Sequence, residues 1–223
     1  MTSPLAFEKF LVIVTYGRSG STLLQTILQS LPGAFIRGEN NMALYPLFRA
    51  WKRAWNTRYN QGPGAIPPTG PWYGADEVQP RRFAESLAAA FVSDILTPPP
   101  GVRVLGFKEI RFHDVEGDDM PDFLDWIRET FPGCRLVFNT RRATDVARSS
   151  FWKSVEMDDV VAMIEGLDAQ YADYLATRPG AGHLVRYDDY VRDVEALRPL
   201  FDYLDEPFDR ARIDAALSRE LKH

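Results

Sequence analysis

Residues 10–28 of the chain, FLVIVTYGRSGSTLLQTIL, decide the fold. The apolar, largely β-branched run at 11–14 is typical of a buried parallel strand, and the apolar spacing at 23–31 is typical of a helix. A Gly/Ser-rich turn joins them. Because a helix N-terminus presents free N–H groups and a positive dipole end, this order predicts an anion site. Gly20 would let the backbone approach a phosphate closely, and Ser21 and Thr22 would add hydroxyl donors.

The chain has 223 residues, which suits a single domain over 1–223 with one main core. Its net charge of −5 gives no sign of a nucleic-acid or anionic-membrane partner, so local cations and amides must hold any anionic ligand. The single cysteine, Cys134, excludes an internal disulfide framework and favours a reducing compartment. With no recognisable signal peptide and no long apolar run, we expect a cytoplasmic protein without a membrane span.

Predicted strands and helices alternate along the chain. Strands are expected at 10–15, 102–107, 135–139 and 183–186, with a weaker one at 34–36. Helices are expected at 21–31, 42–58, 80–96, 121–131, 144–153, 157–177, 189–204 and 208–221. The alternation predicts an α/β fold of three layers, P-loop-like in plan, in which helices flank a central parallel sheet of four to five strands. Ligands of such sheets bind at the carboxyl ends of the strands.

The turn after the first strand is not a Walker A motif. That motif is G-x-x-x-x-G-K-[ST], whereas Gly20 is followed by Ser21 and no lysine. No strand ends in an aspartate placed to hold Mg²⁺. A site of Arg and Lys without a metal suits a donor of lower charge than a nucleoside triphosphate. The cations expected at strand ends are Arg18, Lys108, Arg141 and Arg142.

Four segments occur in the order typical of one enzyme family. They are TYGRSGSTLL from residue 15, FIRGEN from 35, VLGFKE from 104 and NTRRATDVARSS from 139. A possible fifth is HLVRYDDYV from 183. Together they resemble sulfotransferases that use 3′-phosphoadenosine 5′-phosphosulfate (PAPS), in particular the bacterial and tyrosylprotein-type branch. The resemblance covers about residues 10–191, and each motif alone is weak.

The resemblance implies a role for each motif. Glu39 would be the catalytic general base, and Arg18 and Lys108 would stabilise charge around the sulfuryl group. The phosphates would be held by a 5′-phosphate cradle and by a 3′-phosphate pair eight residues apart, and a tyrosine would lie near the nucleotide. These residues are Arg18, Ser19, Gly20, Ser21 and Thr22 for the cradle, Arg142 and Ser150 for the pair, and Tyr187.

The residues also allow other interpretations. Glu39 could serve the start of the next helix, and Lys108 could form an ion pair with Glu109. His113 is a rival base, although the chain lacks the histidine of the cytosolic animal branch in a recognisable context. Arg141 could hold the 3′-phosphate in place of Arg142. Tyr187 could be a core residue, and no C-terminal basic-glycine loop is evident.

The predicted function is in-line transfer of a sulfuryl group from PAPS to a hydroxyl or amine, without a metal. The alternatives are a P-loop kinase-like ATP-dependent phosphotransferase and a non-catalytic nucleotide-binding module. In an enzyme, the Glu39 carboxylate and the Lys108 ammonium should lie within a few ångströms of the Arg18 turn. The Gly/Pro-rich loop at 61–74 is a possible acceptor-side insertion, where Trp72 and Tyr73 could contact a glycan, phenolic or other small-molecule acceptor.

Overall fold

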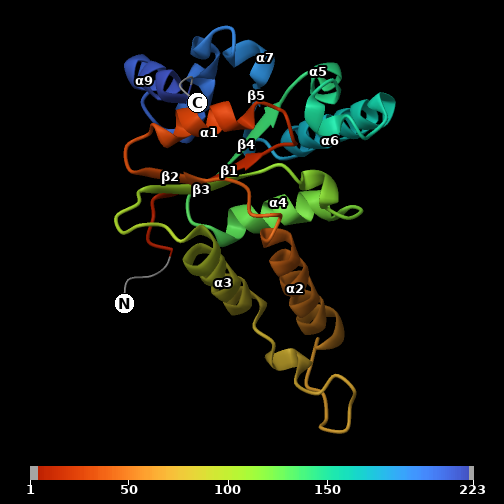
Figure 1. The fold of residues 1–223 in the computed structure, drawn as a ribbon. Coiled ribbons are helices and arrows are strands. Elements are labelled where there is room, and N and C mark those ends of the chain that lie inside the picture. The colour runs from red at the N-terminus through yellow and green to blue at the C-terminus, as the bar shows by residue number, and fades with distance from the viewer. Residues whose placement is uncertain (1–4, 221–223) are drawn as a thin grey trace.

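The computed structural model describes residues 5–220, and its centre is an all-parallel five-stranded sheet (Figure 1). The strand order is β2-β3-β1-β4-β5. The predicted α/β fold is therefore confirmed. The strands are β1 (Lys9–Val14), β2 (Ala34–Arg37), β3 (Val104–Glu109), β4 (Cys134–Thr140) and β5 (Gly182–Arg186).

Helices cover both faces of the sheet, which gives three layers (Figure 1). One face carries α1 (Ser21–Gln29), α7 (Tyr187–Tyr190), α8 (Arg198–Leu204) and α9 (Arg210–Glu220). The other face carries α2 (Leu44–Asn56), α3 (Pro80–Ala90), α4 (Asp119–Thr130), α5 (Ala143–Ala147) and α6 (Met157–Thr177). Alternation along β1 supplies both cores: Leu11 and Ile13 face the α1 side, and Phe10, Val12 and Val14 face the α2 side.

The connections of β1 determine which chain segments meet at the carboxyl ends of the strands. Its sheet neighbours are β3 and β4, and the chain leaves β1 directly for α1. The carboxyl ends of β1, β3 and β4 therefore meet beside the N-terminus of α1. Open α/β sheets bind ligands at such a switch point.

Two predicted helices are broken in the structure. The helix expected at 144–153 ends at Ala147, and a separate 3₁₀ turn follows at Ser150–Trp152. The helix expected at 189–204 consists of α7, a 3₁₀ turn at Val194–Leu197, and α8. The Asp193 side chain accepts a hydrogen bond from the Glu195 N–H and so starts a new turn there. Pro199, in the first turn of α8, fits a helix start better than a helix interior.

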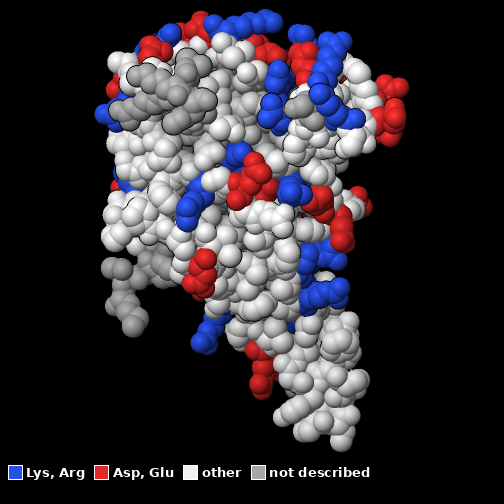
Figure 2. All heavy atoms as spheres, viewed as in Figure 1, with Lys and Arg blue, Asp and Glu red and all other residues white. Residues whose placement is uncertain are grey.

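The helices α2 and α3 form an arm that projects from the sheet and ends in the predicted loop 61–74 (Figure 1). The helices expected at 42–58 and 80–96 end in π-helical turns, Thr57–Gln61 and Phe91–Leu96. No charged residue occurs between 61 and 74, and Figure 2 shows the uncharged end of the arm in white. Within residues 5–220, no helix is long and apolar enough to cross a membrane.

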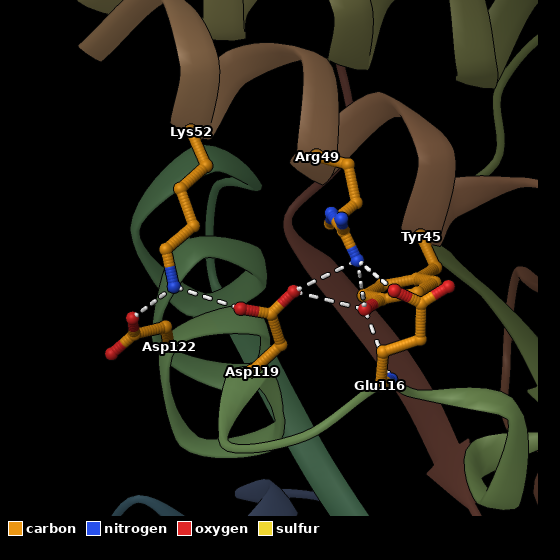
Figure 3. A network of polar contacts seen from close by, with 6 residues as sticks. All are labelled: Tyr45, Arg49, Lys52, Glu116, Asp119 and Asp122. Carbon is orange, nitrogen blue, oxygen red and sulfur yellow. Dashed lines mark hydrogen bonds and ion pairs between the residues drawn. The ribbon is translucent and has the colours of Figure 1, made fainter. Parts of the chain in front are cut away.

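A polar network ties the first half of α2 to the start of α4 (Figure 3). Lys52 Nζ lies 2.8 Å from Asp119 Oδ1 and 2.7 Å from Asp122 Oδ2. Tyr45 donates a hydrogen bond to Asp119 Oδ2, and Arg49 pairs with Glu116 at 2.6 Å. Burial by itself would raise the pKa of Asp119, but hydrogen bonds from Lys52 and Tyr45 outweigh it and hold that pKa below its usual value. Asp119 is thus the centre of the network.

We expect Asp119→Asn to lower the free energy of unfolding by about 1 kcal/mol near pH 7. Because the pKa of Asp119 is lowered in the folded state, its contribution is present above the unfolded pKa of about 3.9 and is lost as the pH falls through the folded value. Urea unfolding at several pH values measures this. An equal difference at all pH values would show a steric effect instead. Asp122→Asn, at a more exposed carboxylate, is the control with the smaller expected loss.

Candidate active site

The turn between β1 and α1 is held from inside by buried hydroxyl and amide groups. The Thr15 hydroxyl lies 2.7 Å from both Ser19 Oγ and the Asn139 carbonyl oxygen. Asn139 donates from Nδ2 to the Ser19 carbonyl at 3.0 Å, and Tyr190 donates to Asn139 Oδ1 at 2.8 Å. The side chains of Thr15, Ser19 and Asn139 are completely buried. The Ser19 hydroxyl is therefore part of the support of the turn, which leaves its backbone as the group nearer a ligand.

Gly20 is the residue before α1 and has a left-handed backbone with φ of +78°. A Cβ atom there would lie 2.0 Å from the Tyr187 ring, so glycine is required by a packed ring as well as by φ. No side chain caps the N-terminus of α1, and its first turn holds no acidic residue. The first N–H groups of a helix have no partner within the helix, so those of Ser21 and Thr22 suit an anion.

Arg18 is the exposed cation of this turn, with a positive φ of 68°. Among the residues that the structure describes, no hydrogen bond or ion pair engages its guanidinium. Its carbonyl oxygen accepts a hydrogen bond from Arg141 Nη1 at 3.0 Å. A left-handed arginine with an uncommitted side chain beside a helix N-terminus is suited to contact a bound anion.

Glu39 and Lys108 meet at the carboxyl end of β3, where Lys108 Nζ lies 2.6 Å from Glu39 Oε1. Lys108 is 6% exposed and pairs in register with Ile13, near the end of β1. The structure therefore brings the predicted carboxylate and ammonium together at the edge that carries the Arg18 turn. The alternative role of Glu39 at a helix start is not seen, because α2 begins only at Leu44 and has no acidic residue in its first turn.

The alternative ion pair between Lys108 and Glu109 does not form. Side chains alternate along a strand, so adjacent residues point to opposite faces of the sheet. Lys108 shares a face with Gly106, whose missing Cβ leaves room against Leu11, whereas Glu109 shares the other face with Phe107. The interpretation as a simple neighbouring ion pair is wrong.

The two adjacent arginines at the end of β4 have different surroundings. The Arg141 guanidinium stacks on the Tyr187 ring at 4.6 Å, and its Nε is buried without a hydrogen-bond partner in the described structure. The Arg142 side chain is 61% exposed and lies 3.6 Å from Asp145. Arg141 therefore supports the turn through its stack on Tyr187 and its hydrogen bond to the Arg18 carbonyl, and Arg142 remains accessible at the surface. The 3₁₀ turn after α5 begins at Ser150, whose side chain lies outside what the structure describes.

The other candidates from the sequence are His113, Trp72 and Tyr73. None of them has a hydrogen bond or ion pair with Glu39 or Lys108 in the described structure. His113 Nε2 lies 3.3 Å from Asp114 Oδ1, and its ring faces Trp152 at 6.4 Å. Trp72 and Tyr73 are 47% and 62% exposed and lie on the projecting arm. With 13 residues at about 1.5 Å each, α2 carries the chain about 20 Å beyond the Glu39 turn. The structure does not bring these two aromatic residues to the anion site.

Sequence reasoning missed the buried support of the site. Tyr16 accepts a hydrogen bond from the Arg141 N–H at 2.8 Å, and Tyr190 anchors Asn139. Burial raises the pKa of Tyr16 far above its ordinary value, so this hydroxyl stays protonated. Tyr16 and Tyr190 lie within two of the quoted motifs, but nothing in their local pattern indicates these distant partners.

A phosphate-bearing nucleotide fits these residues. The uncapped α1 terminus, the Gly20 turn without a side chain, and the unpartnered Arg141 Nε are features that an anion would complete. The Asp188 carboxylate accepts a hydrogen bond from the Arg142 N–H. The site combines a helix N-terminus suited to an anion with a carboxylate–ammonium pair at the end of the neighbouring strand.

Comparisons with known proteins agree with this arrangement. The model of the sulfotransferase family matches residues 11–210, and the chain belongs to that family of enzymes. No curated protein sequence is significantly similar to the chain.

Solved structures show the same fold at low identity. The sulfotransferase domain of the curacin biosynthetic pathway is 16% identical with a TM-score of 0.55, over 93% of this chain and 76% of that one. The sulfotransferase domain of the Synechococcus PCC 7002 olefin synthase is 18% identical with a TM-score of 0.55, over 92% and 76%. A sulfotransferase from Alicyclobacillus acidocaldarius is 13% identical with a TM-score of 0.52, over 88% and 81%.

Proposed function

We propose that the chain transfers the sulfuryl group of PAPS to a hydroxyl or amine acceptor, with Glu39 as general base. The observation that carries this proposal is the 2.6 Å contact between Glu39 and Lys108 at the edge of the sheet that holds the α1 anion turn. A non-catalytic nucleotide-binding module has no need for a carboxylate and an ammonium at that place. A P-loop kinase would need the lysine that is absent after Gly20.

The charges suit a displacement at sulfur. PAPS supplies an activated sulfuryl group, and charge grows on the oxygen that bridges sulfur and phosphate as that S–O bond breaks. Lys108, held at the end of β3, and Arg18, on the turn, would stabilise this charge more in the transition state than in the ground state. Glu39 accepts the proton that the acceptor loses as its oxygen or nitrogen bonds to sulfur.

Lys108 and Glu39 also form a coupled pair. The Glu39 side chain is 39% exposed and can be reached by an acceptor. The Lys108 side chain is only 8% exposed and lies at the end of β3. In this proposal the base faces the acceptor and the cation faces the donor. This division matches the direction in which proton and sulfuryl group must move.

In this proposal, a separate group of residues binds the nucleotide. Arg142, exposed after β4, would hold the 3′-phosphate with Ser150, and the Tyr187 ring beside Gly20 would lie near the nucleotide. The cradle for the 5′-phosphate would be Arg18 with the backbone of residues 19–22. The organisation as one domain over 1–223 and the absence of a metal stay predictions.

Calorimetry with 3′-phosphoadenosine 5′-phosphate and with ADP tests the nucleotide assignment. We expect the 3′-phosphorylated nucleotide to bind more tightly, and Arg142→Ala to weaken it by about 10- to 100-fold, since a charged hydrogen bond contributes about 1.5–3 kcal/mol. ADP affinity should change little. Arg148→Ala, an exposed arginine six residues further along that also lies near Asp145, is the matched control. Equal or tighter binding of ADP to the unaltered chain would exclude a 3′-phosphate site.

A further inference from the structure

Glu109 is a completely buried carboxylate that the proposed chemistry leaves without a role. It follows Lys108 in β3 but points to the opposite face of the sheet, toward the side of α2. A buried carboxylate is costly unless its oxygens are fully hydrogen-bonded. Its partners therefore indicate what it is for.

Four backbone N–H groups donate to Glu109, two to each oxygen. Oε2 accepts from Asn40 at 3.1 Å and from Met42 at 2.8 Å. Oε1 accepts from Ile110 at 2.8 Å and from Arg111 at 3.1 Å. One carboxylate thus joins the turn that follows Glu39 to the end of the strand that carries Lys108.

The turn that Glu109 holds is strained. Asn41 and Met42 have positive φ values of 57° and 58°, and Met42 is buried. Each left-handed residue that is not glycine costs about 1–2 kcal/mol. Such strain persists only where the surroundings impose it. The Asn40 side chain accepts a hydrogen bond from the Ala43 N–H within the turn, and the two hydrogen bonds to Glu109 are those that join the turn to β3.

We propose that Glu109 is a positioning residue that holds Glu39 against Lys108. Glu39 directly precedes Asn40, whose N–H is bound by Glu109, so the backbone of the base is fixed relative to β3. The Lys108 side chain leaves the same strand one residue earlier. Glu109 therefore sets the separation of the base and the cation without touching substrate. This inference rests on the proposed function in which Glu39 is the base.

Glu109→Gln is the test variant, because it keeps the shape and replaces one acceptor oxygen by an NH₂ donor. That donor would face two N–H groups of the Glu39 turn or of the strand end. We expect kcat to fall about 10- to 100-fold, as a displacement of the base by about 1 Å can cause. The affinity for 3′-phosphoadenosine 5′-phosphate should stay within about twofold, since in the described part of the structure no hydrogen bond joins Glu109 to a residue assigned to the nucleotide.

Glu206→Gln is the matched control. Its carboxylate is also buried, at 4%, and accepts hydrogen bonds from Lys9 and Arg103 at the opposite end of the sheet. It should lower stability while kcat of the folded enzyme stays at the level of the unaltered chain. A loss of kcat in Glu206→Gln equal to that in Glu109→Gln would reduce Glu109 to a general stabilising role and overturn the proposal.

Amide hydrogen exchange tests the hydrogen bonds from Asn40 and Met42 to Glu109 independently of catalysis. In the unaltered chain the Asn40 and Met42 amides should exchange slowly, and in Glu109→Gln they should exchange faster, with a changed NMR shift of the Glu39 carboxyl carbon. Fast exchange of both amides in the unaltered chain would overturn the proposal, even if the variant does not fold. A Glu109→Gln variant with unchanged kcat would also overturn the proposal. Failure of the proposed function would show differently, as an unaltered chain that transfers no sulfuryl group while these amides remain protected.

Discussion

Glu39→Gln should lower the rate of sulfuryl transfer about 10²- to 10⁴-fold, the range that a lost general base produces. The substitution keeps the size of the side chain and an oxygen able to accept from Lys108 Nζ, now 2.6 Å from Glu39 Oε1. What it removes is the ability to take a proton. Steady-state and single-turnover rates with radiolabelled PAPS and a panel of acceptors measure the effect.

The control for this variant is nucleotide binding. Affinity for 3′-phosphoadenosine 5′-phosphate should be preserved, because the anion turn and Glu39 come from different connections of the sheet. His113→Gln tests the rival base and should keep the rate within a few-fold, since His113 contacts Asp114 rather than Lys108. Full activity of Glu39→Gln, or a larger loss of rate in His113→Gln, would show that Glu39 is not the general base.

The parts of the fold that the sequence predicted are those with a strong local pattern. The apolar run of β1, the glycine-containing turn and the apolar stripe of α1 lie within twenty-odd residues, and the structure confirms their order. The 21-residue α6 has the predicted bounds. The helices predicted at 144–153 and 189–204 are divided in the structure, because helix-compatible residues continue past the points at which α5 and α7 end.

The site was predictable to the extent that its residues sit at strand ends. Lys108 and the Arg18 turn were expected at one edge because parallel strands bring their carboxyl ends together. The contact of Asn139 with Ser19, 120 residues apart, carries no local signal. The direction of the arm has no local signal either. The loop 61–74 is irregular in sequence, but only the packing of α2 against α4 makes the arm that carries it project from the sheet.

Gly20→Ala should remove most nucleotide binding, with an affinity loss of at least about 10- to 100-fold. The new Cβ would lie 2.0 Å from the Tyr187 ring, and φ of +78° is itself unfavourable for alanine. Either the ring moves, which frees Arg141 from its stacking partner, or the turn moves, which displaces the first N–H groups of α1. Both responses disturb the anion cradle. Calorimetry with 3′-phosphoadenosine 5′-phosphate measures the loss.

Gly74→Ala separates the effect of the positive φ from the effect of the clash. Gly74 has a similar φ of +83°, and no atom of the described structure lies within 4 Å of the added Cβ. It should cost about 1–2 kcal/mol of stability from the backbone alone and leave nucleotide affinity unchanged. Adding Tyr187→Ala to Gly20→Ala removes the clash and should return part of the folding stability but not the nucleotide contact of the ring. If Gly20→Ala binds the nucleotide normally, the turn does not need its close approach to the ligand, and the assignment of the 5′-phosphate to it fails.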